Sequence, residues 1–444
     1  MFKLTPSLSF LFAFGAAAIL SQAIALQGVQ AQSLTEAMPA ALTELMPEVQ
    51  IVGAIDVAGL EREAAEIAEH TGRLLVGKVL DREIDFFEVA SVAVDAAGAA
   101  LFSAAFEVQY ARSLAVHFDQ FHLPAGVQMW CTSDLSASLS ASPSNEAAAW
   151  VEGPYDQREN NEHGRFATGD ALGSVATLWV RVPAGTMGTT QLHIEGFNAT
   201  FASVGASVGA SVGASERGGS AACEVDVACP EIGGWECQRD GVVRLSIIQS
   251  GGSYLCSGSM VNTTSLDCRQ YLLTALHCAD EVTEEEFPLL KVYFNYEKPE
   301  CGSGNGMLSH KRTGVVRLAD SDDNTPQGFN GSDFLLLEVE DAIAATWPVY
   351  YNGWNAVNQT SDWGTGIHHP SGDVKKISTY SEHLTSSSIG GFGTHWSVTW
   401  VETETNHGVT EGGSSGSPIF NPAGLIVGTL SAGFSACSIG GAGG

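Results

Sequence analysis

Short apolar runs separated by turn residues dominate the C-terminal half of the chain. Between residues 242 and 431 these runs are VVRLSII, LCSGSMV, YLLTA, LKVYFNY, DFLLLEV, HWSVTWV and GLIVGTLS. No helix-length amphipathic pattern separates them. Many short strands at this spacing are typical of all-β sandwiches and barrels, whereas α/β folds place helices between their strands. The pattern therefore predicts an all-β domain.

A second region of β-type alternation lies between residues 101 and 201. Its runs are SLAVHFDQFHLP, VQMWC, ATLWVRVP and TQLHIEGF, with Gly, Pro and Asp between them. Alternation of apolar and polar residues is the mark of half-buried strands, so we expect a β-sandwich-like unit here. The preceding stretch, from residue 32 to about 75, is rich in Ala, Glu and Leu and has helical character.

A low-complexity stretch, SVGASVGASVGASERGGS, separates the two β regions. Its small residues cannot bury a core, so residues 203–217 are predicted to be a flexible linker that is open to proteolysis. The linker divides the chain into a β-sandwich-like region, residues 32–202, and an all-β domain, residues 218–444.

The first residues, MFKLTPSLSFLFAFGAAAILSQAIALQGVQAQS, contain an early lysine, an apolar run and then small residues. This order is typical of a Sec-type signal peptide, which we place at residues 1–31, with cleavage after Ala25 or Ala31. The apolar run is too short for a membrane anchor, because a spanning helix needs about 20 apolar residues. We therefore expect a secreted protein without a membrane partner.

The chain of 444 residues has 20 Lys and Arg against 50 Asp and Glu, a net charge of −30. This charge argues against nucleic acid as a partner, because phosphates would be repelled. Nine cysteines in an exported chain predict disulfides, and all but Cys131 lie after residue 220. No CxxC or HExxH spacing is present, so we expect neither a metal site nor a cofactor.

The segment GGSSGSP, residues 412–418, places Ser415 between glycines in a tight turn. Such a turn exposes the serine hydroxyl and lets the amides of Gly413 and Ser415 converge on an oxyanion. A serine nucleophile needs a histidine base and an orienting carboxylate. His277 follows an apolar strand and Asp333 opens another, with spacings of 56 (333 − 277) and 82 (415 − 333) residues. The sequence thus predicts a His277, Asp333 and Ser415 triad in the order His, Asp, Ser.

These motifs resemble those of chymotrypsin-like serine proteases. LTALHC resembles the histidine motif LTAAHC, SDFLLLEV the DIALL-type aspartate strand, and GSSGSP the serine motif GDSGGP. Further segments resemble the secreted bacterial lysyl endopeptidases of the Achromobacter protease I type, namely CEVDVACPE, CSGSMVN, IHHPSGDVKKIS and VTEGGSSGSPIF. The resemblance implies an all-β fold in which a chymotrypsin-like double β-barrel is preceded by a β-rich pro-region.

The function implied is that of a secreted serine endopeptidase, made as a precursor, that cleaves after Lys or Arg through an acyl-enzyme. Its partners would be protein or peptide substrates and its own pro-region, and we expect a monomer without a cofactor. The resemblance also implies disulfides Cys223–Cys437, Cys229–Cys301 and Cys256–Cys278. Elimination leaves Cys237 and Cys268 for a fourth bridge.

The chain departs from this family in its specificity residues. The pocket aspartate of the family has no counterpart, Ser431 stands at the pocket histidine, and SSIGGFGTHW lacks the family tryptophan, so the residues associated with lysine preference in the family are changed or absent here. No lysine lies between Lys78 and Lys291, so we place the processing site between Arg217 and Gly218. Because Ser414 replaces the aspartate that precedes the nucleophile, we expect processing to relieve a steric block or complete folding.

Two other interpretations remain open at this stage. A protease-like binding protein would keep the fold without catalysis, and residues 32–202 would be a carbohydrate- or surface-binding module if they stayed attached. The adjacent His368 and His369 do not favour a metal site, because neighbouring residues on a strand face opposite sides. The resemblance places their HHPSGD segment in a structural turn.

Overall fold

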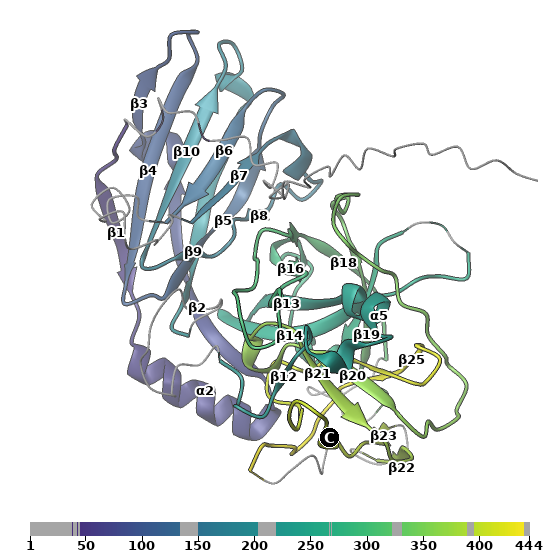
Figure 1. Ribbon diagram of the computed structural model, residues 1–444. Helices are drawn as coiled ribbons and strands as arrows, with labels where there is room; N and C mark the ends of the chain where they lie inside the picture. The colour runs from purple at the N-terminus through teal and green to yellow at the C-terminus, as the bar shows by residue number, and fades with distance from the viewer. Residues whose placement is uncertain are drawn as a thin grey trace, which may run out of the picture. The chain divides into compact units, whose positions relative to one another are not determined.

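The computed structural model describes residues 38, 42, 45–133, 150–202, 219–265, 267, 269–321, 331–388 and 395–438 (Figure 1). All of these belong to one unit of the chain, Thr35–Gly444. The predicted signal peptide, the linker and the Arg217–Gly218 processing site lie outside the described residues. Among the helices that are described, none is long and apolar enough to cross a membrane.

The N-terminal region is a sandwich of two β-sheets, which we call the N-terminal module. Its first sheet has the order β1-β4-β10-β6-β7, and β3 also pairs with β4. The strands of this sheet are β1 (Val49–Ala54), β3 (Ser91–Val94), β4 (Ala100–Gln109), β6 (Gln128–Thr132), β7 (Val151–Tyr155) and β10 (Val175–Val182). β1 runs parallel to β4, whereas the other pairs are antiparallel.

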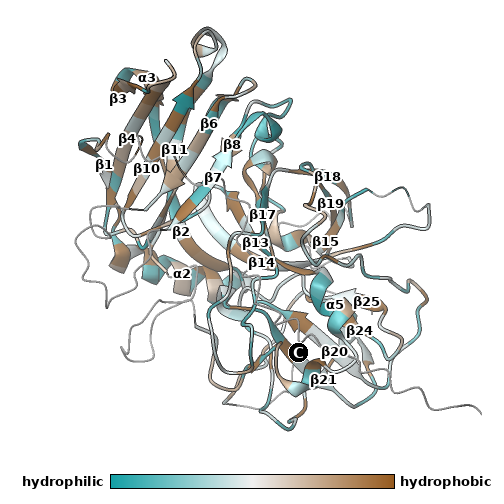
Figure 2. Cartoon of the chain, turned by 45° about the horizontal axis from the view of Figure 1, so that its top comes forward, coloured by the Kyte–Doolittle hydropathy of each residue, from teal (hydrophilic) through white to brown (hydrophobic). Residues whose placement is uncertain are grey.

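The second sheet of the module has the order β2-β11-β5, with β8 and β9 both paired to β5. Its strands are β2 (Leu74–Asp85), β5 (Ser113–His122), β8 (Phe166–Ala167), β9 (Ala171–Leu172) and β11 (Gln191–Thr200). Phe106, Phe118, Leu178 and Phe197 lie fully buried in the core of the sandwich. The strands that the alternating pattern predicts, β5, β6, β10 and β11, are therefore confirmed. Figure 2 shows the hydropathy along β6, β10 and β11.

Helix α2 (Val57–Thr71) precedes β2, and the short helix α3 (Phe86–Val89) follows it. The Asp56 side chain accepts the Gly59 amide at the N-terminus of α2, and Gly72 ends the helix in the left-handed conformation with a φ of 71°. The predicted helical stretch from residue 32 to 75 is thus wrong for residues 49–54, which form β1. The segment VQIVGA is rich in β-branched residues, which favour a strand.

The strands from β13 to β19 form the first barrel of the C-terminal region. They follow the path β17-β16-β13-β14-β15-β19-β18, and Gly314, with a φ of 95°, joins β17 directly to β18. Because the two ends of the path are consecutive in the chain, the sheet curls back on itself. The strands are β13 (Val242–Gln249), β14 (Gly252–Met260), β15 (Tyr271–Ala275), β16 (Lys291–Phe294), β17 (Lys311–Thr313), β18 (Val315–Asp320) and β19 (Phe334–Val339).

A second sheet, of five strands in the described residues, has the order β12-β21-β20-β24-β25, and a two-stranded ribbon accompanies it. The sheet contains β12 (Val225–Asp226), β20 (Gly364–His368), β21 (Lys376–Tyr380), β24 (Pro418–Phe420) and β25 (Ile426–Thr429). The ribbon pairs β22 (Thr385–Ser387) with β23 (His395–Ser397), and helix α5 (Glu236–Gly241) precedes β13. The predicted all-β class, with two antiparallel β units in the chymotrypsin-like order, is confirmed.

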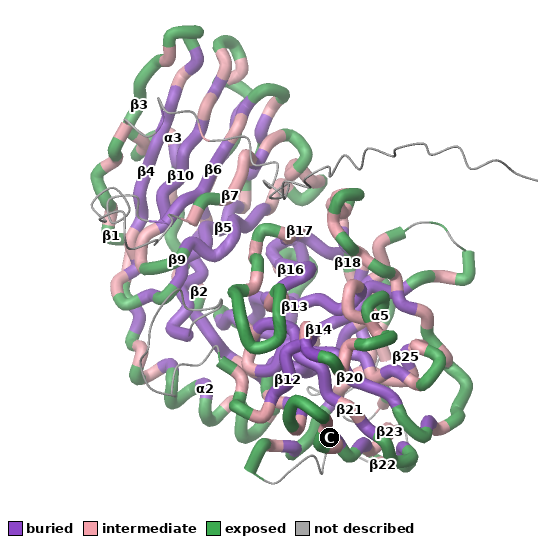
Figure 3. Tube along the Cα trace, in the orientation of Figure 1, coloured by how far each residue is buried: buried purple, intermediate pink, exposed green. Residues whose placement is uncertain are grey.

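The N-terminal module and the first barrel share one continuous sheet. β2 lies between β11 of the module and β14 of the barrel, and it pairs antiparallel with both. Leu255 of β14 belongs to the same buried core cluster as the strands of the module. Figure 3 shows buried residues along both β2 and β14. The sandwich and the barrel, which the sequence separates by a linker, are therefore joined through backbone hydrogen bonds.

Candidate active site

His277 and Asp333 meet where two neighbouring strands of the first barrel end. β15 leads into a short 3-10 helix, Leu276–Cys278, and Asp333 directly precedes β19, which pairs with β15. One carboxylate oxygen of Asp333 accepts the His277 amide at 2.9 Å, and the other contacts Nδ1 of the ring at 2.7 Å. The His277 side chain is almost fully buried and Asp333 is completely buried. The carboxylate thus fixes both the backbone and the ring of the histidine.

A hydroxyl group completes the surroundings of the Asp333 carboxylate. Ser431 Oγ donates to Asp333 Oδ2 at 2.5 Å, across 98 residues of sequence. Asp333 also has a φ of 50°, and its carbonyl accepts the Leu276 amide at 2.9 Å. A buried carboxylate needs hydrogen-bond partners, and the His277 amide, the His277 ring and the Ser431 hydroxyl supply them. Sequence comparison marks Ser431 only as a changed pocket residue, whereas the structure places its hydroxyl on Asp333.

Ser415 lies in a turn that packs against the ends of β14 and β15. Its carbonyl accepts the Ser257 amide at 2.8 Å, and the Gly416 amide donates to Leu430, next to Ser431. Gly416 has a φ of 79°, and a Cβ placed there would lie 2.1 Å from Thr274 Oγ1. Only glycine fits this position, because any side chain would push the turn away from the strand that leads to His277.

The amides of Gly413 and Ser415 donate no hydrogen bond to any residue that the structure describes. Gly413 has a φ of 90°. Its carbonyl oxygen accepts a hydrogen bond from Ser257 Oγ at 2.9 Å, which holds the turn against β14. Among the described residues, Ser415 Oγ forms no hydrogen bond with His277. The structure therefore holds two of the three predicted triad residues together and places the third in the adjoining turn.

Ser257 is a residue of the site that sequence reasoning missed. Besides its bonds to Gly413 and Ser415, its Oγ accepts the amide of His369 at 2.9 Å. It therefore ties the serine turn to β14 and to the segment after β20. Its position directly after Cys256, whose partner Cys278 adjoins His277, was the available signal.

His368 and His369 support the serine turn from the second sheet. His368 is fully buried, with Nδ1 2.8 Å from Ser414 Oγ and Nε2 2.9 Å from Ser378 Oγ. Burial, helped by the charge of Lys376, lowers the pKa of His368 to about 3, so the ring is neutral. His369 Nδ1 lies 2.9 Å from the carbonyl oxygen of Asp373. Ser414, at the position of the missing aspartate, is thus held by a neutral imidazole.

Three disulfides brace the C-terminal region, with the pairings that the family resemblance implies. They are Cys223–Cys437, Cys229–Cys301 and Cys256–Cys278. The predicted Cys237–Cys268 bridge is wrong, because Cys237 on α5 is an exposed free thiol; Cys268 lies outside the described residues. Elimination counts cysteines without asking whether the fold brings two Cβ atoms into bonding geometry. Cys131 is a free thiol buried in the N-terminal module.

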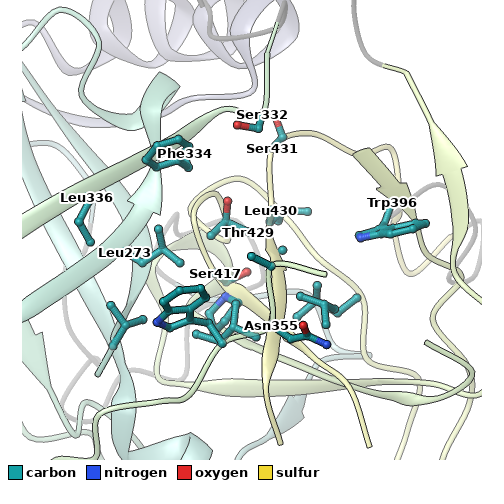
Figure 4. A pocket seen from close by; sticks show the side chains of 18 of the residues that line it. Leu273, Ser332, Phe334, Leu336, Asn355, Trp396, Ser417, Thr429, Leu430 and Ser431 are labelled. Carbon is teal, nitrogen blue, oxygen red and sulfur yellow. The ribbon is translucent and has the colours of Figure 1, made fainter. Parts of the chain in front are cut away.

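A cavity of about 950 Å³ adjoins the site on the side of Ser431. Figure 4 shows Ser332 and Ser431 close together at one end of it, with Phe334 and Trp396 on opposite sides. Thr410 and Ser417 also line it, from the two sides of the serine turn. Among the described lining residues none is a carboxylate, so the cavity offers no negative charge to a basic side chain.

The comparisons with known proteins agree with the motifs. The family model for the lysyl endopeptidase C-terminal domain matches residues 217–443, about half of the chain. A curated lysyl endopeptidase from Pseudomonas aeruginosa is 30% identical over 213 residues, which cover 47% of this chain and 43% of that protein. The matched part therefore spans less than half the length of this relative.

Two solved structures are similar to the chain. The thermostable serine protease AL20 from an extremophilic microorganism is 15% identical, with a TM-score of 0.32, and covers 45% of this chain and 88% of its own. The protease Anisep from Arthrobacter nicotinovorans is 16% identical, with a TM-score of 0.32, and covers 44% and 85%. The family match rests on the sequence: residues 217–443 carry the domain model across the histidine, aspartate and serine motifs. The chain belongs to the lysyl endopeptidase family.

Proposed function

We propose that the chain is a secreted serine endopeptidase that is made as an inactive precursor. The observation that carries this proposal is the arrangement around His277. Asp333 holds its amide and its Nδ1. The turn with Ser415 lies beside the same strand ends, and its Gly413 and Ser415 amides donate to no residue within the described ranges. Residues 32–202 would be the pro-region, released by a cut between Arg217 and Gly218.

The reaction follows from the chemistry of these groups. Ser415 Oγ attacks the carbonyl carbon of the scissile peptide while His277 Nε2 takes its proton, and Asp333 stabilises the resulting imidazolium. The amides of Gly413 and Ser415 stabilise the oxyanion; one such donor contributes roughly 10²- to 10³-fold to the rate. His277 then protonates the leaving amine, and water hydrolyses the acyl-enzyme. No cofactor takes part in these steps.

The preferred side chain before the scissile bond would be basic, Lys or Arg. Support comes from membership of the lysyl endopeptidase family and from the name of the Pseudomonas aeruginosa relative. The absence of a carboxylate among the described cavity residues means that a basic side chain would have to find its negative partner elsewhere. Substrates would be proteins or peptides outside the cell, acted on by a monomer.

Labelling with a fluorophosphonate probe tests the catalytic proposal. The secreted protein should be labelled by the probe, and the labelling should be lost in Ser415→Ala. It should be kept in Ser381→Ala, because Ser381 is exposed and lies outside the site. Asp333→Asn should slow hydrolysis of a peptide substrate by roughly 10³-fold or more, because an amide in place of the carboxylate holds the histidine in the wrong tautomer. Absence of labelling in the native protein would instead favour a protease-like binding protein.

N-terminal sequencing of the secreted protein tests the precursor proposal. A mature start at Gly218 is expected, and digestion of a protein of known sequence should give cuts after Lys or Arg. A mature start far from Gly218 would contradict the processing site without affecting the assignment of Ser415.

A further inference from the structure

The segment Gly72–Leu75 lies against the catalytic residues as an added strand. After α2 ends at Gly72, β2 pairs antiparallel with β14, with Leu74 opposite Leu255 and Leu75 opposite Tyr254. Leu255 directly precedes Cys256, whose disulfide partner Cys278 follows His277. A chain bound along this edge of β14 therefore runs directly towards the catalytic histidine.

Arg73 contacts the histidine segment itself. Its Nε donates to the carbonyl oxygen of His277 at 2.9 Å, and its Nη2 donates to Asp280. A second carboxylate, that of Glu281, lies 3.7 Å from Nη1. The side chains of Arg73 and Asp280 are 9% and 8% exposed, so this ion pair is largely shielded from water. Such shielding makes the contact selective for a cation.

Leu74 reaches the other side of the site. A Cβ placed on Gly413 would lie 3.0 Å from Leu74 Cδ2, and one on Gly412 would lie 3.8 Å from the carbonyl oxygen of Gly72. The segment Gly72–Leu74 thus lies between His277 and the glycines of the serine turn. Because it covers Gly413, it occupies space that a peptide needs to reach the oxyanion amides.

The covered half of the cleft is the one opposite the cavity. In the proposed endopeptidase, the cavity on the side of Ser431 would receive the side chain that precedes the scissile bond. The edge of β14 therefore receives the residues that follow the bond, since an extended peptide binds by adding a strand to an open edge. In the chain itself the residues before Gly72 form α2, so no extended peptide bond is presented to Ser415.

Asp280 retains an unused acceptor on this edge. Its Oδ2 is buried and accepts no hydrogen bond from any residue of the described ranges. Glu281 is about half exposed, and its Oε2 accepts Ser250 Oγ at 3.1 Å. Two carboxylates facing a single guanidinium leave net negative charge, which a Lys or Arg from another chain would also neutralise.

We infer that Asp280 and Glu281 form a subsite for a basic side chain just after the scissile bond, and that Arg73 fills it in the precursor. The inference rests on the proposed endopeptidase function. It names a second determinant of specificity, separate from the cavity. It also assigns the block of the precursor to Arg73 and Leu74.

Internally quenched peptides test the subsite. Two peptides differ only in the residue after the scissile bond, Arg in one and Gln in the other, and kcat/KM is measured with the processed enzyme at low salt. The Arg peptide should be favoured about tenfold, and this ratio should fall to about two in Asp280→Asn. Glu285→Gln, an exposed neighbour, should keep the native ratio. Because the ratio is taken within each enzyme, changes in overall rate cancel.

The unprocessed chain supplies a second measurement. Fluorophosphonate should label its Ser415 at least several-fold faster in Arg73→Ala than in the native chain, while Arg62→Ala, on the exposed face of α2, leaves the rate unchanged. Equal ratios for native enzyme and Asp280→Asn, or an unchanged labelling rate in Arg73→Ala, would overturn the inference. Failure of the proposed function is distinct, because native processed protein would then not be labelled at all.

Discussion

Two of the patches where the N-terminal module contacts the first barrel differ in kind. The cleft patch is Gly72–Leu75, which pairs with β14 beside His277. The anchor patch is Asp170, whose carboxylate binds Lys291 Nζ at 2.6 Å and Tyr293 Oη at 2.7 Å. Lys291 and Tyr293 lie on β16, which β13 separates from β14 in the sheet.

If Arg73 and Leu74 block the cleft as proposed, the residues that block the cleft differ from those that anchor the module. The anchor patch is charged and buried. Burial lowers the pKa of Lys291; burial also raises the pKa of Asp170, but the charge of Lys291 and the hydrogen bonds from Lys291 and Tyr293 outweigh this and lower it. The cleft patch relies on backbone pairing and on the ion pairs of Arg73 with Asp280 and Glu281 at its border. Mutations should therefore separate the two properties.

The largest effect is expected at the anchor patch. Asp170→Asn leaves Lys291 buried without a charged partner, which costs about 3–5 kcal/mol in the free energy of unfolding of the uncleaved chain. Denaturation in urea measures this, with Asp362→Asn as control, since Asp362 pairs with His383 at an exposed site. The control should change stability by less than about 1 kcal/mol. Equal effects would show that the buried pair does not anchor the module.

A pH dependence is expected at the cleft patch. Burial raises the pKa of Asp280 from 3.8 to about 6, against the charge of Arg73 and with help from Glu281. The folded chain therefore binds a proton that the unfolded chain releases, so stability relative to Asp280→Asn should rise as the pH falls from about 7 to 4. The largest gain in the free energy of unfolding that this pKa shift allows is about 3 kcal/mol. Urea denaturation of both chains across this range measures the difference, and a difference that falls with falling pH would contradict the burial of Asp280.

The smallest effect is expected at a further ion pair between the module and the barrel, that of Glu152 and Lys311. Lys311 Nζ lies 2.8 Å from Glu152 Oε1, and Glu152 is partly exposed. Glu152→Gln keeps the shape and removes the charge, so a loss of about 1 kcal/mol is expected in the same denaturation experiment. A loss as large as that of Asp170→Asn would mean that the anchor patch extends to this pair.

The strands were predictable because their signal is local. Alternation marks β5 and β10, and compact apolar runs mark β13, β14 and β19, so each was visible within a few residues. The strand β1 was hidden because its neighbours are rich in helix-forming residues. The Cys237 bridge was mispredicted for a related reason, because a count of cysteines does not say which of them lie close together in the fold.

The contacts that complete the site are not local. Order and spacing were enough to nominate His277, Asp333 and Ser415, since each stands next to a strong motif. The bond from Ser431 to Asp333 spans 98 residues, and the bond from Arg73 to His277 spans 204. Such pairs depend on how strands stack and pair, which no short window of sequence contains.

Because β2 lies inside a continuous sheet, cutting the linker would not by itself release the N-terminal module from the barrel. A cut in the linker would leave two chains that still share every hydrogen bond between β2 and β14. Departure of the module would then uncover the β14 edge, and the departing β2 would carry an uncovered edge of its own. Free strand edges invite pairing with any extended chain. The released module would therefore be both prone to aggregate and a ready peptide for the cleft that it had just vacated.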